Sequence, residues 1–135
     1  MFKRLLPNSL KTANEATSQT AMLDPIVLEG LRDLAGEQHL VIIERFLIFS
    51  SGAFTDIEAA LADNNIKNVK EVAHSLKSSS LQLGATELGN LATDLEAACH
   101  AGDMEATHSI VPQIRLIGEQ TNAAFSQYID AQRTA

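Results

Sequence analysis

One histidine of this chain, His74, lies in a stretch whose polar side carries a high density of positive charge. On a helical wheel with about 100° per residue, the apolar side chains around it gather on one side and His74 points away from them. The side chains within about 60° of His74 on that wheel are Lys67, Lys70, Lys77, Ser78 and Leu81. Three of the chain's five lysines thus share one short face of a protein with a net charge of -7, which indicates a site for an anionic group.

The imidazole of His74 is chemically suited to accept a phosphoryl group. In its neutral form it offers an unshared electron pair near neutral pH without first losing a proton. Lys77, one turn along the same face, can compensate part of the charge on the phosphoryl oxygens. The sequence has no G-x-x-x-x-G-K-[ST] loop, no Gly-rich kinase loop and no acidic triad placed to hold Mg²⁺ beside His74, so we expect a partner to supply the remaining catalytic groups.

The segment from Ala73 to Ala85 reads A-H-S-L-K-S-S-S-L-Q-L-G-A and resembles the signature of histidine-containing phosphotransfer (HPt) domains. That signature has a histidine, a lysine three residues later, small residues after it and a glycine ten residues past the histidine. The corresponding residues are His74, Lys77, Ser78 to Ser80, and Gly84. Ser78 stands where many family members have glycine, but serine is also small, so we expect a partner still to have room.

The resemblance implies a role as an intermediate in a multistep phosphorelay. His74 would accept a phosphoryl group from a receiver-domain aspartate and pass it to another response regulator, with a hybrid sensor histidine kinase among the partners. The protein would be a phosphoryl carrier rather than an enzyme, with no cofactor of its own, and Mg²⁺ would be held by the receiver domain. The residues expected to contact the partner are Lys67, Lys70, Ser78 and Leu81, with part of the preceding helix.

Two other functional classes compete with this interpretation. A bundle metalloprotein would use paired Glu-x-x-His motifs, and the chain has Glu71 with His74 and Glu105 with His108. Such ligands must face the bundle core, whereas His74 and Glu71 lie on the other side of their helix, where lysines would repel a cation. The second alternative is an interaction module that binds receiver domains or helical partners without being phosphorylated. Only the presence of both His74 and Lys77 argues against it. The remaining histidines, which we expect to be structural or solvated, are His39, His100 and His108.

Length and composition favour one helical domain. The 135 residues are 45% hydrophobic but only 4% aromatic, which is typical of an aliphatic helical core. No apolar run reaches about 18 residues and the N-terminus lacks a secretory signal, so we expect no membrane span and no export. The single cysteine, Cys99, is expected in the core and is compatible with a cytoplasmic location. A pI near 4.9 argues against general nucleic-acid binding.

Cap and turn residues divide the chain into a short helix and four long ones. Asp24 and Pro25 start the short helix, and Gly36 ends it. The long helices are predicted at about Gln38 to Asp63, Ile66 to Leu83, Thr86 to His100, and from Asp103 past Tyr128. Pro112 should kink or divide the last one, because proline costs about 3 kcal/mol inside a regular helix.

The predicted fold class is therefore all-α, an up-down antiparallel four-helix bundle with a short extra N-terminal helix. Short connections make neighbouring helices antiparallel. We assign the bundle domain to residues 24–135 and an N-terminal extension to residues 1–23, and a monomer is the simplest state for such a bundle.

Apolar residues predict which faces of the first two helices are buried. In the short helix they are Ile26, Val27, Leu31 and Leu34. In the longest helix the inner set is Val41, Ile42, Phe46, Phe49, Phe54, Ile57 and Leu61. A second apolar set follows on its other faces: Leu40, Ile43, Leu47 and Ile48. Part of this surface must therefore meet a second helix or a partner.

Overall fold

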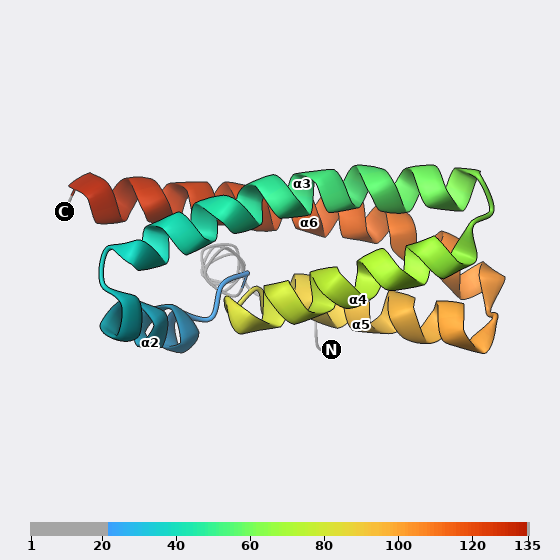
Figure 1. Ribbon diagram of the computed structural model, residues 1–135, viewed down its shortest axis with the longest axis horizontal. Helices are drawn as coiled ribbons and strands as arrows, with labels where there is room; N and C mark the ends of the chain where they lie inside the picture. Colours follow the sequence, from blue (N-terminus) through green and yellow to red (C-terminus); the bar gives the residue numbers. More distant parts are fainter. Residues whose placement is uncertain (1–21, 135) are drawn as a thin grey trace, which may run out of the picture.

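The computed structural model describes residues 22–134, and within this range all regular secondary structure is helical (Figure 1). A short helix, α2 (Pro25–Ala35), precedes four long ones: α3 (Gln38–Ala62), α4 (Ile66–Gln82), α5 (Thr86–Ala101) and α6 (Met104–Thr134). Helix α3 packs against α4 and α6, and α5 packs against the same two helices. The predicted up-down four-helix bundle with a short additional helix is confirmed.

The predicted N-terminal extension lies almost wholly outside the described residues. Its last two residues, Met22 and Leu23, are described and are buried in the core beside the start of α2. Within residues 22–134, none of the helices combines the length and hydrophobicity that a membrane-spanning segment needs.

Side-chain caps fix the N-terminal ends of three helices. The oxygens of Asp24, Asn65 and Asp103 accept hydrogen bonds from backbone amides at 2.9, 3.2 and 3.1 Å, respectively. These amides lie in the first turn, where no carbonyl of the same helix is available to them. Capping therefore explains why α2, α4 and α6 begin where the sequence predicts.

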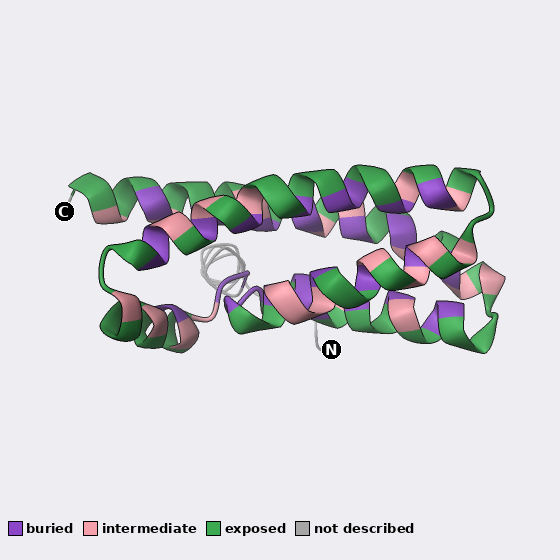
Figure 2. Cartoon of the chain, viewed as in Figure 1, coloured by how far each residue is buried: buried purple, intermediate pink, exposed green. Residues whose placement is uncertain are grey.

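The core is a continuous set of aliphatic side chains with a few aromatic rings, and purple bands mark it along the inner sides of the helices in Figure 2. Its largest fully buried side chains include Phe54, Phe125 and Ile43. Cys99 is buried, as predicted. The core therefore depends on helix-to-helix packing of apolar side chains rather than on covalent links.

Several predictions of buried faces were wrong. Ile42 and Phe49, predicted to lie inside α3, are each 38% exposed, whereas Leu40 and Ile43 are buried. The inward line of α3 must face both α4 and α6, so it is rotated from the arc that the apolar residues alone suggest. In α2 the prediction failed for Ile26 and Leu34, which are exposed, whereas Val27 and Leu31 are half-buried and Leu28 is the buried residue of this helix.

Pro112 lies inside α6, which continues without division from Met104 to Thr134. Proline removes one backbone donor and leaves the carbonyl four residues earlier, that of His108, without its helical partner. Both residues are exposed, so water can satisfy that carbonyl. Of the predicted kink or division at Pro112, the division does not occur.

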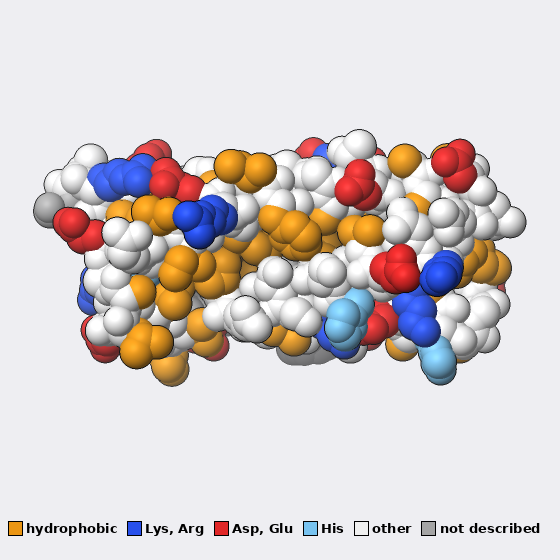
Figure 3. Space-filling model, viewed as in Figure 1, with side chains coloured by type: hydrophobic (Ala, Val, Ile, Leu, Met, Phe, Trp, Pro, Cys, Tyr) orange, Lys and Arg blue, Asp and Glu red, His pale blue; other side chains and the backbone are white. Residues whose placement is uncertain are grey.

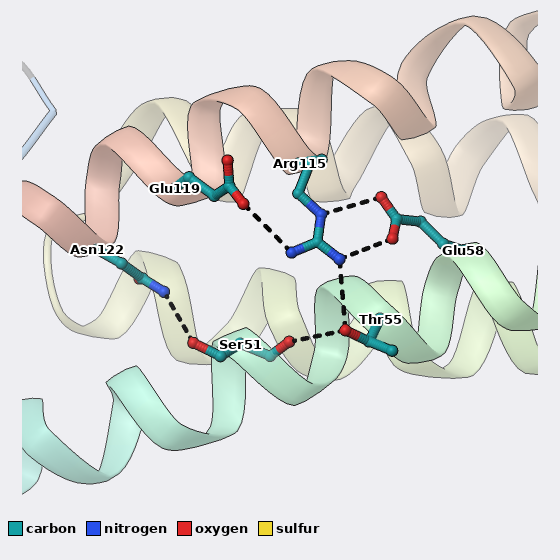
Figure 4. Close-up of polar contacts among 6 residues, drawn as sticks. All are labelled: Ser51, Thr55, Glu58, Arg115, Glu119 and Asn122. Atoms are coloured by element: carbon teal, nitrogen blue, oxygen red, sulfur yellow. Dashed lines mark hydrogen bonds and ion pairs between the residues drawn. The ribbon is translucent and has the colours of Figure 1, made fainter.

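An arginine clamp joins α6 to α3 (Figure 4). Arg115 donates from Nε and Nη2 to the two carboxylate oxygens of Glu58 at 3.0 and 2.7 Å, and from Nη1 to Glu119 at 3.4 Å. The hydrogen bonds from Arg115 hold the pKa of Glu58 below its ordinary value. The two parallel hydrogen bonds of this ion pair link α6 to α3 on this face.

Candidate functional site

The helical hairpin α4–α5 positions His74. It turns at Gly84, whose φ of 81° lies in the left-handed region that favours glycine. A Cβ at Gly84 would also lie 3.1 Å from the carbonyl oxygen of Asp24. The tight turn fixes the register of the two antiparallel helices, and this register places His74 opposite Glu96.

His74 points outward, as the helical wheel predicts, and its side chain is 59% exposed. Its Nδ1 lies 2.7 Å from Oε2 of Glu96. A carboxylate only accepts hydrogen bonds, so Nδ1 carries the proton and donates it. In the neutral ring Nε2 then holds the unshared electron pair and is the nucleophilic atom.

Lys77 lies on the other side of the same carboxylate. Its Nζ donates to Oε1 of Glu96 at 2.6 Å, so Glu96 binds His74 and Lys77 at once. The hydrogen bond from Lys77 lowers the pKa of Glu96 below its ordinary value of 4.5, burial opposes this effect, and the bond from His74 adds to the lowering. Glu96 is therefore ionised at neutral pH, and on the acid side both bonds weaken as the pH falls through that lowered pKa.

A shallow pocket of about 480 Å³ surrounds the histidine. It is lined by Lys67, Lys70, Glu71, His74 and Glu96. Figure 3 shows Lys, His and acidic side chains gathered over α4 on one face of the molecule. The structure thus brings two of the lysines predicted to contact a partner, Lys67 and Lys70, to the edge of the site, and we call these two residues the basic rim.

Lys70 has a neighbour on α5 that the sequence did not indicate. Its Nζ lies 2.9 Å from Nδ1 of His100 on α5. Because an ammonium only donates, His100 accepts here through Nδ1. His100 therefore lies next to Lys70 at the edge of the site, but it does not line the pocket.

The two other predicted contact residues follow His74 along α4. Ser78 is half-buried and Leu81 is 43% exposed. Neither lines the His74 pocket. Leu81 lies against Gly89 of α5, because a Cβ added at Gly89 would lie 2.5 Å from Cδ2 of Leu81. Both residues extend the surface beyond the pocket rather than form part of it.

Glu96 is a residue of the candidate site that the sequence analysis missed. It lies 22 positions from His74, so no helical wheel places the two together. The register of the hairpin is the signal that could have identified it, because a tight turn determines which residues of the two helices face one another. The pairs that face one another across the turn at Gly84 are Leu81 with Gly89, His74 with Glu96, and Lys70 with His100. A short turn between two predicted helices therefore carries enough information to search the opposing helix for partners.

Replacing Glu96 with alanine should leave both tautomers of the neutral His74 ring populated. Without the carboxylate the proton of His74 is no longer held on Nδ1, and the ring rotates more freely. Ring ¹⁵N NMR would show protonated Nδ1 in the wild type and a mixture of tautomers in Glu96→Ala. Asp94→Ala, which removes an exposed carboxylate of the same helix, is the control; an unchanged His74 spectrum in Glu96→Ala would contradict this role.

The metalloprotein alternative finds no support in the geometry. Glu71 and His74 are both exposed on α4, and His108 is exposed on α6. Among residues 22–134, no group of three or more His, Cys, Asp or Glu side chains is arranged to hold a metal ion.

The remaining histidine of the described range, His39, is structural. It is buried, with Nδ1 2.6 Å from the carbonyl oxygen of Gly36 and Nε2 2.8 Å from the hydroxyl of Tyr128. A carbonyl oxygen only accepts, so Nδ1 donates and Nε2 of the neutral ring accepts from Tyr128. Both ring nitrogens are therefore occupied, and the ring joins α3 to α6.

Comparisons with known proteins identify the family of the chain and solved structures with the same fold. The family model described as "Hpt domain" matches residues 41–131. Among solved structures, histidine-containing phosphotransfer protein B (HptB) from Pseudomonas aeruginosa PAO1 is similar with a TM-score of 0.78 and 23% identity, over 82% of this chain and 96% of that one. Histidine-containing phosphotransfer protein MtHPt2 from Medicago truncatula is similar with a TM-score of 0.72 and 20% identity, over 98% of this chain and 92% of that one. No curated protein sequence matches the chain.

Proposed function

Because the chain belongs to the Hpt domain family and is therefore a histidine phosphotransfer protein of a phosphorelay, we propose that His74 is the residue that carries the phosphoryl group. Hpt domains act with receiver domains and histidine kinases of two-component systems. The observation that carries the assignment is the hydrogen bond from Nδ1 of His74 to Glu96, which leaves Nε2 free on an exposed ring. His39 has both nitrogens occupied and is buried.

In the proposed reaction, Nε2 of His74 attacks the phosphorus of a receiver-domain aspartyl phosphate in line with the leaving carboxylate. The N–P bond forms, the P–O bond to the aspartate breaks, and the aspartate leaves as a carboxylate. The proton stays on Nδ1, so no base is needed. The positive charge that develops on the ring is stabilised by the Glu96 carboxylate. Transfer to a second receiver domain reverses these steps.

Lys77 and the basic rim would compensate the charge of the phosphoryl oxygens. Lys77 is held on Glu96 at 2.6 Å, one turn along α4 from His74, and Lys67 and Lys70 line the same pocket. We further propose that Ser78 and Leu81 extend the surface on which the receiver domain docks.

In this proposal the protein is a carrier that has no kinase site and no cofactor of its own. The receiver domain supplies Mg²⁺ and the groups that bind it, and a hybrid sensor histidine kinase stands upstream. The cytoplasm is the compartment in which these partners meet, and a monomer leaves the His74 face free for each of them in turn.

A two-step transfer assay tests the proposed function. The full chain is mixed with a receiver domain that carries a labelled aspartyl phosphate, and an unlabelled second receiver is added after the first has been removed. We expect label to appear on the chain and then on the second receiver. Binding of receivers without any labelling of a folded chain would instead favour the interaction module that carries no phosphoryl group.

Replacing Lys77 with alanine should slow transfer about 10-fold, a loss of about 1.4 kcal/mol in transition-state stabilisation. A double-mutant cycle with Glu96→Gln separates two roles of the lysine. If Lys77 acts on the phosphoryl oxygens, Lys77→Ala still slows transfer in the Glu96→Gln background, by a factor that differs from the wild-type one because the two residues are in contact. If Lys77 only holds Glu96, its effect disappears in the Glu96→Gln background, which would contradict direct charge compensation. Single-turnover rates of transfer from a phosphorylated receiver measure both effects.

A further inference from the structure

A groove of about 400 Å³ runs between α3 and α4 beside the candidate site. Its lining includes Ile48, Phe49, Gly52 and Asp56 of α3, with Glu71 and Val72 of α4. Figure 3 shows hydrophobic side chains along the seam between these helices, on the same face as the Lys and His side chains. Glu71 also lines the His74 pocket, so the groove and the pocket form one continuous surface.

The lining of this groove includes a glycine, Gly52, that the fold itself does not require. Gly52 lies in the middle of α3, and its φ is not positive, so alanine would adopt the same backbone conformation. A Cβ at Gly52 would meet no atom within 4 Å. By contrast, a Cβ at Gly89 or Gly118 would overlap a neighbouring side chain. Because glycine weakens a helix interior relative to alanine, Gly52 lowers stability without improving internal packing.

We propose that Gly52 determines how closely a partner receiver domain docks, by leaving room for one of its apolar side chains in the α3–α4 groove. This inference rests on the proposed function, because continuity with the His74 pocket identifies the occupant. Ile48 is 78% exposed and Phe49 38% exposed, so both have apolar surface to bury when an apolar side chain enters the groove.

The charges around the groove define the partner further. Asp56 and Glu71 lie on its two sides, one on each helix. A matching receiver surface therefore presents an apolar side chain flanked by lysine or arginine, while its acidic phosphorylation site faces the basic rim around His74. This alternation of charge along one surface would fix the orientation in which the two proteins meet.

Substitutions at Gly52 test the inference through opposite effects on stability and binding. Gly52→Ala should raise the melting temperature by about 2–5 °C, because alanine favours the helix. The same substitution should weaken receiver binding about fivefold, and Gly52→Leu, which fills the groove, should weaken it by tenfold or more. The probe is the receiver domain that exchanges phosphoryl groups fastest with the wild-type chain, and the dissociation constant is measured by titration.

Gly30→Ala is the matched control, because Gly30 is an exposed helical glycine of α2 whose Cβ would also meet nothing within 4 Å. It should raise the melting temperature similarly and leave receiver binding unchanged. Wild-type affinity in both Gly52 variants would overturn the inference while leaving phosphoryl transfer by His74 intact. Loss of labelling at His74 in the wild type counts against the proposed function instead. Dimers of the wild-type chain that Gly52→Leu dissociates would also overturn the inference, because the groove would then hold a second copy.

Discussion

Replacing His74 with glutamine should abolish phosphoryl acceptance while the bundle stays folded. Glutamine has no ring nitrogen that can attack phosphorus, but its amide can still donate a hydrogen bond to Glu96. His74 is exposed, so the free energy of unfolding should change by no more than about 0.5 kcal/mol. Label transferred from a phosphorylated receiver measures the first effect, and circular dichroism with urea unfolding measures the second.

His108→Gln is the matched control for this experiment. His108 is an exposed histidine on α6, outside the pocket that surrounds His74. It should accept label at the wild-type rate. A His74→Gln variant that is labelled like the wild type would show that another residue carries the phosphoryl group and that the site has been assigned wrongly.

Replacing Gly118 with alanine should destabilise the bundle by about 1–3 kcal/mol, the range typical of overpacking a core. Gly118 is buried on α6, and a Cβ at this position would overlap the ring of Phe54 on α3. Phe54 is only 2% exposed and has the guanidinium of Arg115 over its ring, so it has little room to move. The free energy of unfolding from urea titrations measures the loss.

Gly30→Ala should stabilise the protein by about 0.5–1 kcal/mol in the same assay, because there the added methyl group meets only solvent. The two substitutions are chemically identical and both lie within helices. Equal effects at the two positions would contradict the close approach of α3 and α6 at Gly118.

The sequence predicted the fold well where a local signal decides the structure. Asp24, Asn65 and Asp103 cap helices, and Gly84 forms a tight turn, because these residues act within a few positions of themselves. It failed for Ile42, which is 38% exposed, because a helix with several apolar faces does not show which one its neighbours cover.

The sequence predicted the part of the site that lies on one helix and missed the part that depends on packing between helices. A helical wheel places His74 outward with Lys77 one turn away, since both residues belong to one helix. Glu96 belongs to the next helix and was missed, because its position depends on the register of the hairpin. The groove at Gly52 depends on how α3 and α4 pack, which no single-helix pattern contains.

The most direct test of the central claim is to locate the phosphoryl group on the wild-type chain. The protein is labelled from a phosphorylated receiver domain in the presence of Mg²⁺, kept at alkaline pH and analysed by mass spectrometry with fragmentation that preserves the phosphate. NMR of the ¹⁵N-labelled ring then identifies the bonded nitrogen. We expect an acid-labile, alkali-stable phosphate on Nε2 of His74. Phosphate on Nδ1 of His74, or on His39, His100 or His108, would contradict the account.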